Sequence, residues 1–106
     1  SDLLRPMLYG AVYEPLLANR ADEESTGTFR VVGKHCESGD VLVSDAHLPD
    51  VRVGDLLCIP ATGAYGVSMA SNYNGVARPA VLFVHGGEAR VVTRRETYAE
   101  ILAREV

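Results

Sequence analysis

Cys36 and Glu37 are neighbours in a short polar segment, residues 33–40, whose sequence is GKHCESGD. A thiol is mostly protonated at neutral pH, so Cys36 can donate a proton, and the Glu37 carboxylate can bind a cation. Neighbouring side chains of a strand point to opposite faces, whereas Ser38-Gly39 favours a turn. We therefore expect the end of a strand that presents both side chains from a loop. The alternative is an inert, half-buried cysteine beside a solvated glutamate.

Arg5 and Tyr9 form a second cluster that could bind a polar ligand. They share parity in the segment RPMLY, so a strand through residues 7–13 would present both on one face. A guanidinium binds a carboxylate or phosphate through two hydrogen bonds, and a phenol can add another. The alternative for Arg5 is a surface charge near the terminus.

Tyr65 lies between Gly63 and Gly66, directly after an apolar segment. Glycine lets a ligand approach the backbone closely, so such a loop can carry the phenol hydroxyl to a ligand oxygen. The alternative is a plain turn between a strand and a helix, with Tyr65 packed on the core. We interpret the polar segment 71–74, SNYN, as a structural helix end rather than as a site.

Most of the chain has the pattern of short strands, in which β-branched and aromatic residues are bounded by Gly, Pro, Asp and Asn. Residues 81–84 are continuously apolar, which is typical of a strand covered on both faces. The Gly86-Gly87 pair predicts a hairpin turn between the last two strands. The expected strands are residues 7–13, 28–35, 40–44, 56–60, 80–85 and 89–95.

Two helices are expected beside the strands. Residues 67–73 could form a short helix that ends at Asn74-Gly75. Thr97 and Glu100 have the spacing of a capping box, which predicts a C-terminal helix, and we expect this helix to cover an open edge of the sheet. The sequence thus predicts a mainly β fold, a small β-barrel with a short helix and a C-terminal helix.

Composition limits the kinds of protein that this chain can be. Its 106 residues suit a single domain, and an apolar share of 47 % is enough for a core. The net charge of −4 argues against nucleic-acid binding, and no segment is long and apolar enough to span a bilayer. The three histidines show no metal-ligand spacing. Two cysteines are too few for a secreted disulfide scaffold, so we expect a cytoplasmic protein without a metal, nucleic-acid or membrane partner.

The order of these clusters resembles the C-terminal domain of the diaminopimelate decarboxylases, a family that depends on pyridoxal 5′-phosphate. The stretch CESGD is quite specific, because related ornithine and arginine decarboxylases usually carry Asp where Glu37 stands. The resemblance implies a small Greek-key β-barrel like the C-terminal domain of alanine racemase. The segments that carry it are RPxxYGA from Arg5, VGKHCESGD from Val32, GDL from Gly54, ATGAYG from Ala61, SNYN from Ser71, RPA from Arg78 and RRET from Arg94.

The resemblance also implies a role for each candidate residue. Cys36 would be the proton donor that reprotonates the substrate carbon after carbon dioxide leaves. Glu37 would bind the distal amino group of the substrate. Arg5 and Tyr9 would form a substrate-binding pair, with Arg5 on the distal carboxylate. Tyr65 would contact both the substrate and the cofactor near its phosphate. Cys36 and Glu37 would reach the active site of a partner subunit, so the implied catalytic unit is a homodimer.

The chain departs from the family in one large respect. The N-terminal (β/α)₈ barrel of the family, which holds the cofactor through a lysine and a glycine-rich loop, has no counterpart in residues 1–106, and Lys34 is the single lysine. We therefore expect the substrate-recognition and dimerisation domain of an enzyme that converts meso-diaminopimelate into L-lysine and carbon dioxide, inactive when alone. The alternatives are the same domain of an ornithine or arginine decarboxylase, against which Glu37 argues, and a binding module without catalysis.

Overall fold

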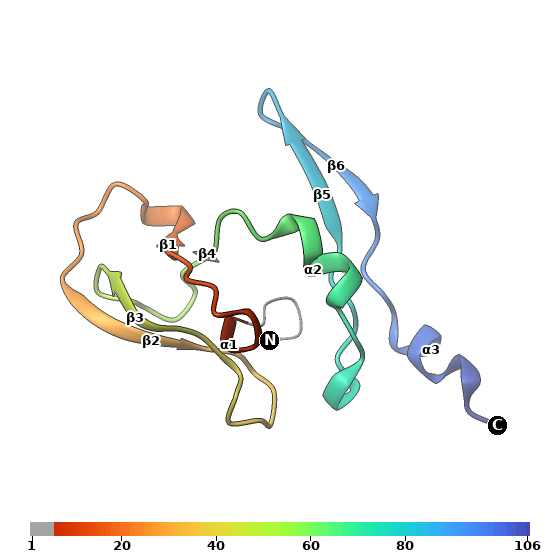
Figure 1. Cartoon of the computed structure of the whole chain (residues 1–106). Helices are drawn as coiled ribbons and strands as arrows, with labels where there is room; N and C mark the ends of the chain where they lie inside the picture. Colours follow the sequence, from red (N-terminus) through yellow and green to blue (C-terminus); the bar gives the residue numbers. More distant parts are fainter. Residues whose placement is uncertain (1–5) are drawn as a thin grey trace.

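The computed structural model describes residues 6–106, in which short strands alternate with short helices and 3₁₀ turns (Figure 1). The helices are α1 (Pro6–Tyr9), α2 (Gly63–Met69) and α3 (Tyr98–Ile101), and the 3₁₀ turns are η1 (Ala18–Arg20), η2 (Tyr73–Gly75) and η3 (Leu102–Arg104). The strands are β1 (Leu16–Leu17), β2 (Gly27–Val32), β3 (Val41–Leu48), β4 (Leu57–Cys58), β5 (Val81–His85) and β6 (Glu88–Thr93). The mainly β class, with few short helices, is confirmed. No helix in this part of the chain has the length and apolarity needed to cross a membrane.

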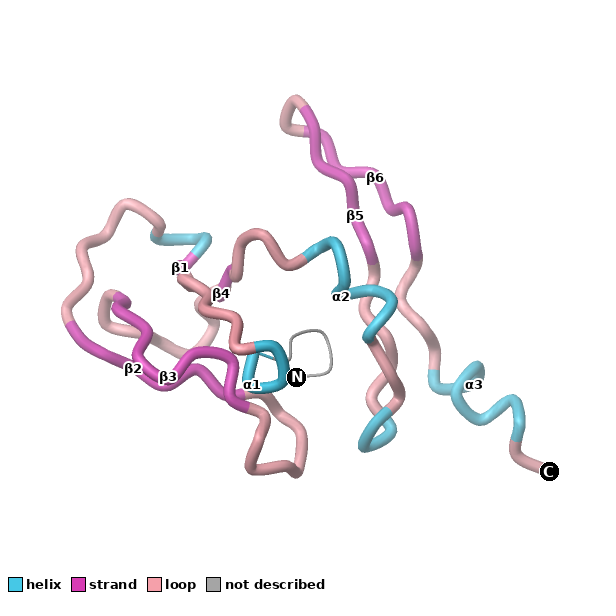
Figure 2. The backbone as a smooth tube through the Cα atoms, viewed as in Figure 1, coloured by secondary structure: helices cyan, strands magenta, loops and turns pink. Residues whose placement is uncertain are grey.

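The strands pair antiparallel in three ladders, β1 with β4, β2 with β3 and β5 with β6. The longest ladder runs from the Gly27–Leu48 pair to the Val32–Val41 pair, with irregular register around Val31. The expected strand 40–44 therefore continues to Leu48. The connection between β2 and β3 is the segment 33–40, which extends beyond the paired strands (Figure 2).

The core is built on β2 and β3, because alternate residues of a strand point to the same face. Val31 of β2 and both Ala46 and Leu48 of β3 are buried, and Leu17 of β1 is buried against them. Phe29 packs on the side of this cluster. The core is thus formed by the same two strands, β2 and β3, that carry the loop 33–40.

The first expected strand, residues 7–13, is wrong, because the chain forms α1 there instead. Pro6 suits the first turn of a helix, since its fixed φ is helical and its missing N–H would have no partner there. Gly10 then takes a left-handed φ of 63°, and the Ala11 N–H donates to the Pro6 carbonyl at 3.1 Å. This arrangement is a Schellman motif, which ends a helix with a glycine and closes its last turn.

The hairpin between β5 and β6 is confirmed, with positive φ values of 57° at Gly86 and 80° at Gly87. The expectation that residues 81–84 are covered on both faces is wrong: Phe83 is 59 % exposed and Val84 is 72 % exposed. The hairpin projects from the rest of the molecule, where no other described strand pairs with it (Figure 1). An apolar sequence run therefore forms a two-stranded sheet with exposed faces.

The two expected helices are present with changed bounds or packing. The helix expected over residues 67–73 is α2, which begins earlier and ends at Met69. The capping box of α3 is confirmed, since the Thr97 side chain accepts from the Glu100 N–H and the Glu100 side chain accepts from the Thr97 N–H. However, α3 lies beyond the end of β6 with Tyr98 72 % exposed, so the expectation that it covers a sheet edge is wrong (Figure 1).

Candidate functional site

The base of the loop 33–40 is closed by hydrogen bonds to Asp40, which is 7 % exposed. The Gly33 N–H donates to the Asp40 carbonyl at 2.8 Å, and the His35 N–H donates to Asp40 Oδ2 at 2.9 Å. A side chain at position 33 has no space, because its Cβ would lie 2.0 Å from Asp40 Oδ2. Glycine at position 33 therefore permits the close approach that sets the width of the loop.

The tip of the loop is docked on η2. The Cys36 backbone N–H donates to the side-chain Oδ1 of Asn74 at 3.0 Å. The rings of His35 and Tyr73 meet edge to face, with their centroids 5.5 Å apart and their planes at 74°. Two consecutive loop residues thus contact two consecutive residues of a turn that lies far along the chain.

Cys36 and Glu37 are both presented to solvent from this loop, as the sequence predicts. The Cys36 thiol is free and exposed, which argues against the alternative of a half-buried, inert cysteine. The Glu37 N–H donates to the His35 carbonyl at 2.8 Å, which turns the backbone sharply. The Glu37 carboxylate lies over Gly39, since a Cβ there would stand 3.0 Å from Glu37 Oε1. A thiol and a carboxyl group therefore share one exposed turn.

The other candidate residues lie on different elements. Tyr65 is in the first turn of α2 rather than in a loop, and its side chain is 75 % exposed, so the alternative of a tyrosine packed on the core is also wrong. Tyr9 ends α1 and is 67 % exposed, so it is not on a strand. Arg5 lies outside the described residues. Within residues 6–106, no hydrogen bond or ring contact joins Tyr9 or Tyr65 to the Cys36–Glu37 step.

The turn at residues 71–75 belongs to the site, although its sequence suggested a purely structural role. The Asn72 amide Nδ2 donates to Glu96 Oε2 at 2.5 Å, and the Arg78 N–H donates to the same oxygen at 2.9 Å. The Arg78 backbone N–H and the Asn72 amide lower the pKa of Glu96 below its usual value. The available signal was Asn74-Gly75, which favours positive φ, but nothing local indicated contact with Cys36.

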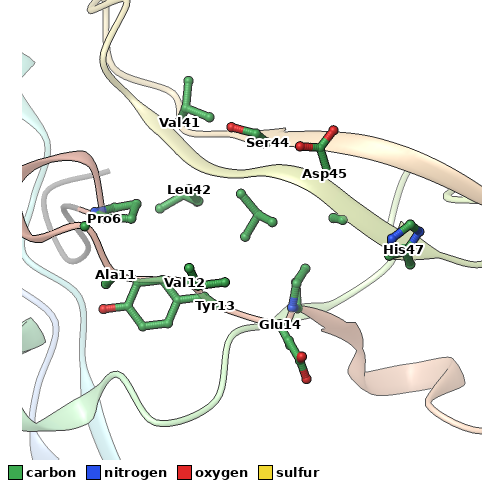
Figure 3. A pocket seen from close by; sticks show the side chains of 14 residues that line it. Pro6, Ala11, Val12, Tyr13, Glu14, Val41, Leu42, Ser44, Asp45 and His47 are labelled. Carbon is green, nitrogen blue, oxygen red and sulfur yellow. The ribbon is translucent and has the colours of Figure 1, made fainter.

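A groove with a volume of about 720 Å³ lies elsewhere, between the segment 10–15 and β3. Figure 3 shows Tyr13 and Glu14 on one side of it and Asp45 on the other. Neither Cys36, Glu37 nor Tyr65 lines this groove. Residues 6–106 also contain no group of three or more His, Cys, Asp and Glu side chains that could hold a metal ion. The candidate site is thus an exposed loop rather than a pocket of this chain.

Comparison with known proteins gives a consistent set of relatives. Residues 1–63 match the family model of the pyridoxal-dependent decarboxylase, C-terminal sheet domain. The diaminopimelate decarboxylase of Bacillus subtilis is 54 % identical over 96 % of this chain and 23 % of the relative. The diaminopimelate decarboxylase of Synechocystis is 50 % identical over 99 % of this chain and 22 % of the relative.

Solved structures show the same likeness. The diaminopimelate decarboxylase of Helicobacter pylori, solved in complex with L-lysine, superposes with a TM-score of 0.85 at 38 % identity. That alignment covers 98 % of this chain and 25 % of the solved chain. The present chain therefore spans about a quarter of the length of the proteins it matches.

Proposed function

Because the chain belongs to the pyridoxal-dependent decarboxylases, as their C-terminal sheet domain, we propose that it is the substrate-recognition and dimerisation domain of a diaminopimelate decarboxylase. The reaction is the conversion of meso-diaminopimelate into L-lysine and carbon dioxide. The observation that carries the proposal is the exposed Cys36–Glu37 step, held at its base by Asp40 and at its tip by Asn74. The Helicobacter pylori relative was solved with L-lysine, the product of the proposed reaction.

Cys36 has the chemistry of the proton donor. When carbon dioxide leaves, the electron pair of the broken bond stays with the substrate carbon, and the Cys36 thiol transfers its proton to that carbon. The thiolate then takes up a proton from water. The exposure of Cys36 at the tip of a loop is compatible with action on a substrate held outside this chain, in a catalytic unit assembled from two subunits.

Glu37 and Arg5 have opposite charges, which suits a substrate whose far end carries both an ammonium and a carboxylate. We assign binding of the ammonium to Glu37. We assign binding of the carboxylate to Arg5, with Tyr9 as the second member of the substrate-binding pair. We assign Tyr65 to contacts with both the substrate and the phosphate of the cofactor, and its exposure of 75 % on α2 supports contact with groups outside the domain. A shorter carboxylate at position 37 would suit ornithine or arginine decarboxylases, so Glu37 favours diaminopimelate.

We infer that this chain does not hold pyridoxal 5′-phosphate alone. The single lysine, Lys34, is exposed on the loop 33–40, and Lys34 and Tyr65 line neither the groove beside β3 nor a smaller groove between α2 and the segment that follows β6. When bound to the enzyme, pyridoxal 5′-phosphate supplies the electron sink for decarboxylation. The remaining part of the decarboxylase would supply the cofactor pocket and the lysine, and this chain would add Tyr65.

The free thiols of Cys36 and Cys58 support a reducing, cytoplasmic setting.

A chimera tests the proposal: this chain replaces the matching quarter of the Bacillus subtilis decarboxylase. With pyridoxal 5′-phosphate we expect the chimera to release carbon dioxide from meso-diaminopimelate and to form L-lysine. We expect the 106-residue chain to release none and to retain no cofactor absorbance after dialysis. A dimeric chimera that holds the cofactor but decarboxylates ornithine or arginine instead of diaminopimelate would contradict the assigned substrate. A Schiff-base absorbance band that maps to Lys34 of the isolated chain would contradict the proposal that cofactor binding requires the rest of the enzyme.

A further inference from the structure

We infer that Asn74 is a positioning residue for Cys36, because its amide oxygen fixes the backbone point from which the thiol is presented. This inference rests on the proposed function, since the benefit of a fixed thiol is an efficient proton transfer. The contact that carries it joins the Cys36 N–H to Asn74 Oδ1 at 3.0 Å across 38 positions of sequence.

The conformation of Asn74 explains only part of the choice of residue. Asn74 has φ 57° and ψ 23°, in the left-handed region that glycine adopts without cost and that asparagine tolerates better than most residues. Glycine would satisfy this conformation equally well, as it does at Gly75 with φ 69°. The left-handed backbone conformation therefore does not by itself require a side-chain amide at position 74. The oxygen of that amide accepts the hydrogen bond from the Cys36 N–H.

Asn74 can act as a fixed point because its turn is itself anchored. The Gly75 N–H donates to the Asn72 carbonyl at 2.9 Å, which closes the turn. The Asn72 side chain donates to the Val76 carbonyl at 3.1 Å and to Glu96 Oε2 at 2.5 Å. The turn is thus held from the segment that follows β6, and this restraint passes through Asn74 to the loop.

A second contact acts beside the first. The Tyr73 ring meets the His35 ring edge to face, one residue before the Asn74–Cys36 hydrogen bond in both segments. Together the two contacts oppose both translation and rotation of the loop tip. The side chain of Cys36 takes no part in either contact, so the thiol stays available while its backbone is restrained.

The same anchored region holds the end of α2, the helix that carries Tyr65. The Arg78 guanidinium donates through Nε to the Ala70 carbonyl at 3.2 Å and through Nη1 to Glu96 Oε1 at 3.0 Å. The loop with Cys36 and the helix with Tyr65 are therefore attached to one polar network centred on Glu96. A proton donor and a substrate contact that must act on one molecule gain from such a shared support.

Two substitutions separate the side-chain contact from the backbone conformation. Asn74→Gly keeps the left-handed conformation and removes the acceptor, whereas Asn74→Asp keeps an acceptor oxygen in nearly the same shape. Hydrogen–deuterium exchange of the 106-residue chain, resolved by NMR, reports on the Cys36 amide directly. We expect exchange there to be about tenfold faster or more in Asn74→Gly and near the original rate in Asn74→Asp, because only the former loses the acceptor.

Kinetics of the chimera then test the positioning role. We expect Asn74→Gly to lower kcat by about tenfold to a hundredfold with KM changed less than about twofold, since misplacement of a reacting group affects the chemical step. We expect Asn74→Asp to recover most of that loss. Unchanged Cys36 amide exchange in Asn74→Gly, or an unchanged kcat, would overturn the inference. If Cys36→Ala also leaves kcat unchanged, the proposed function of Cys36 fails; if Cys36→Ala lowers kcat while Asn74→Gly does not, only the positioning role fails.

Discussion

Gly33 and Asp40 are packed so closely that the loop which presents Cys36 requires a residue without a side chain at position 33. A Cβ at position 33 would stand 2.0 Å from Asp40 Oδ2, which is well inside van der Waals contact. The same carboxylate accepts the His35 N–H, so displacing it also disturbs the residue next to Cys36. At the scale of single residues, the geometry of the site therefore depends on Gly33 as much as on the reactive side chains.

We predict that Gly33→Ala destabilises the chain by ~1–3 kcal/mol, the typical cost of inserting a methyl group into a fully packed position. Urea unfolding followed by circular dichroism measures this loss as a lower transition midpoint. Gly63→Ala is the matched control, because a Cβ at position 63 meets nothing within 4 Å. Equal midpoints for the two variants would contradict the close packing of Gly33 on Asp40.

We predict that Cys36→Ala and Glu37→Gln impair the chimera in different ways. A general acid acts in the transition state, so Cys36→Ala should lower kcat by roughly 10²- to 10⁴-fold with little change in substrate binding. In its proposed role Glu37 binds the non-reacting end of the substrate, so Glu37→Gln should lower kcat/KM for diaminopimelate by roughly 10- to 100-fold relative to analogues with altered distal groups. Steady-state kinetics of both variants measures the difference. A Cys36→Ala variant that keeps its kcat while chemistry limits the rate would exclude Cys36 as the donor.

At the scale of elements, a side-chain network joins two strands that are too short to hold each other. β1 and β4 pair through two residues each. Asp55, just before β4, accepts from Arg20 Nη2 at 2.5 Å, from Asn19 Nδ2 at 2.9 Å and from the Arg52 N–H at 2.8 Å. Hydrogen bonds from Arg20 first, and then from Asn19 and Arg52, hold the pKa of Asp55 far below its usual value of 3.8. The ionised carboxylate is therefore a structural part of this connection.

We predict that this connection makes the chain sensitive to acid. The folded state lowers the pKa of Asp55, so the unfolded state binds more protons, and the stabilisation is fully present above the unfolded value of 3.8. It is lost as the pH falls from that value toward the folded pKa. Urea midpoints measured between about pH 6 and pH 3 should fall less in Asp55→Asn than in the original chain. Asp55→Asn should already be less stable at neutral pH, and parallel pH profiles of the two chains would argue against the network.

At the scale of the whole molecule, the chain has little core and much exposed apolar surface. Its radius of gyration is 15.5 Å, whereas a compact domain of this length has a value of about 13 Å. The buried hydrophobic side chains of the described residues belong to Leu17, Val31, Ala46 and Leu48. The β5–β6 hairpin instead leaves both of its faces open, because the neighbours Leu82 and Phe83, which point to opposite faces, are 50 % and 59 % exposed. Apolar surface of this kind favours association with another surface.

We predict that the isolated chain self-associates through the β5–β6 hairpin. Phe83→Lys should weaken the association, because Phe83 is 59 % exposed and a charge there would have to be buried in the contact. Val53→Lys is the control, since Val53 is fully exposed on a loop before β4. Sedimentation velocity over a range of concentrations measures the effect. A monomer at high concentration, or equal weakening by both substitutions, would refute the role of the hairpin.

Local patterns were sufficient to predict much of this molecule. The mainly β class, the Gly86-Gly87 turn and the capping box of Thr97 and Glu100 depend on residues that lie at most a few positions apart. The exposed Cys36–Glu37 loop follows from the same kind of information, because a turn-forming pair comes directly after a strand. The family, too, was evident from short motifs and their order, and the comparisons confirm it.

Contacts between distant segments decided the rest. The segment 7–13 is an exception, because its strand pattern lost to another local signal: Pro6 and Gly10 favour a short helix that the Ala11–Pro6 hydrogen bond closes. The run 81–84 has the pattern of a covered strand, yet Leu82, Phe83 and Val84 are exposed, since a hydrophobic pattern indicates what a strand can bury and not what is present to bury it. The docking of Asn74 on Cys36 joins residues 38 positions apart, and no local propensity encodes such a pair, because it exists only once the chain brings η2 against the β2–β3 loop.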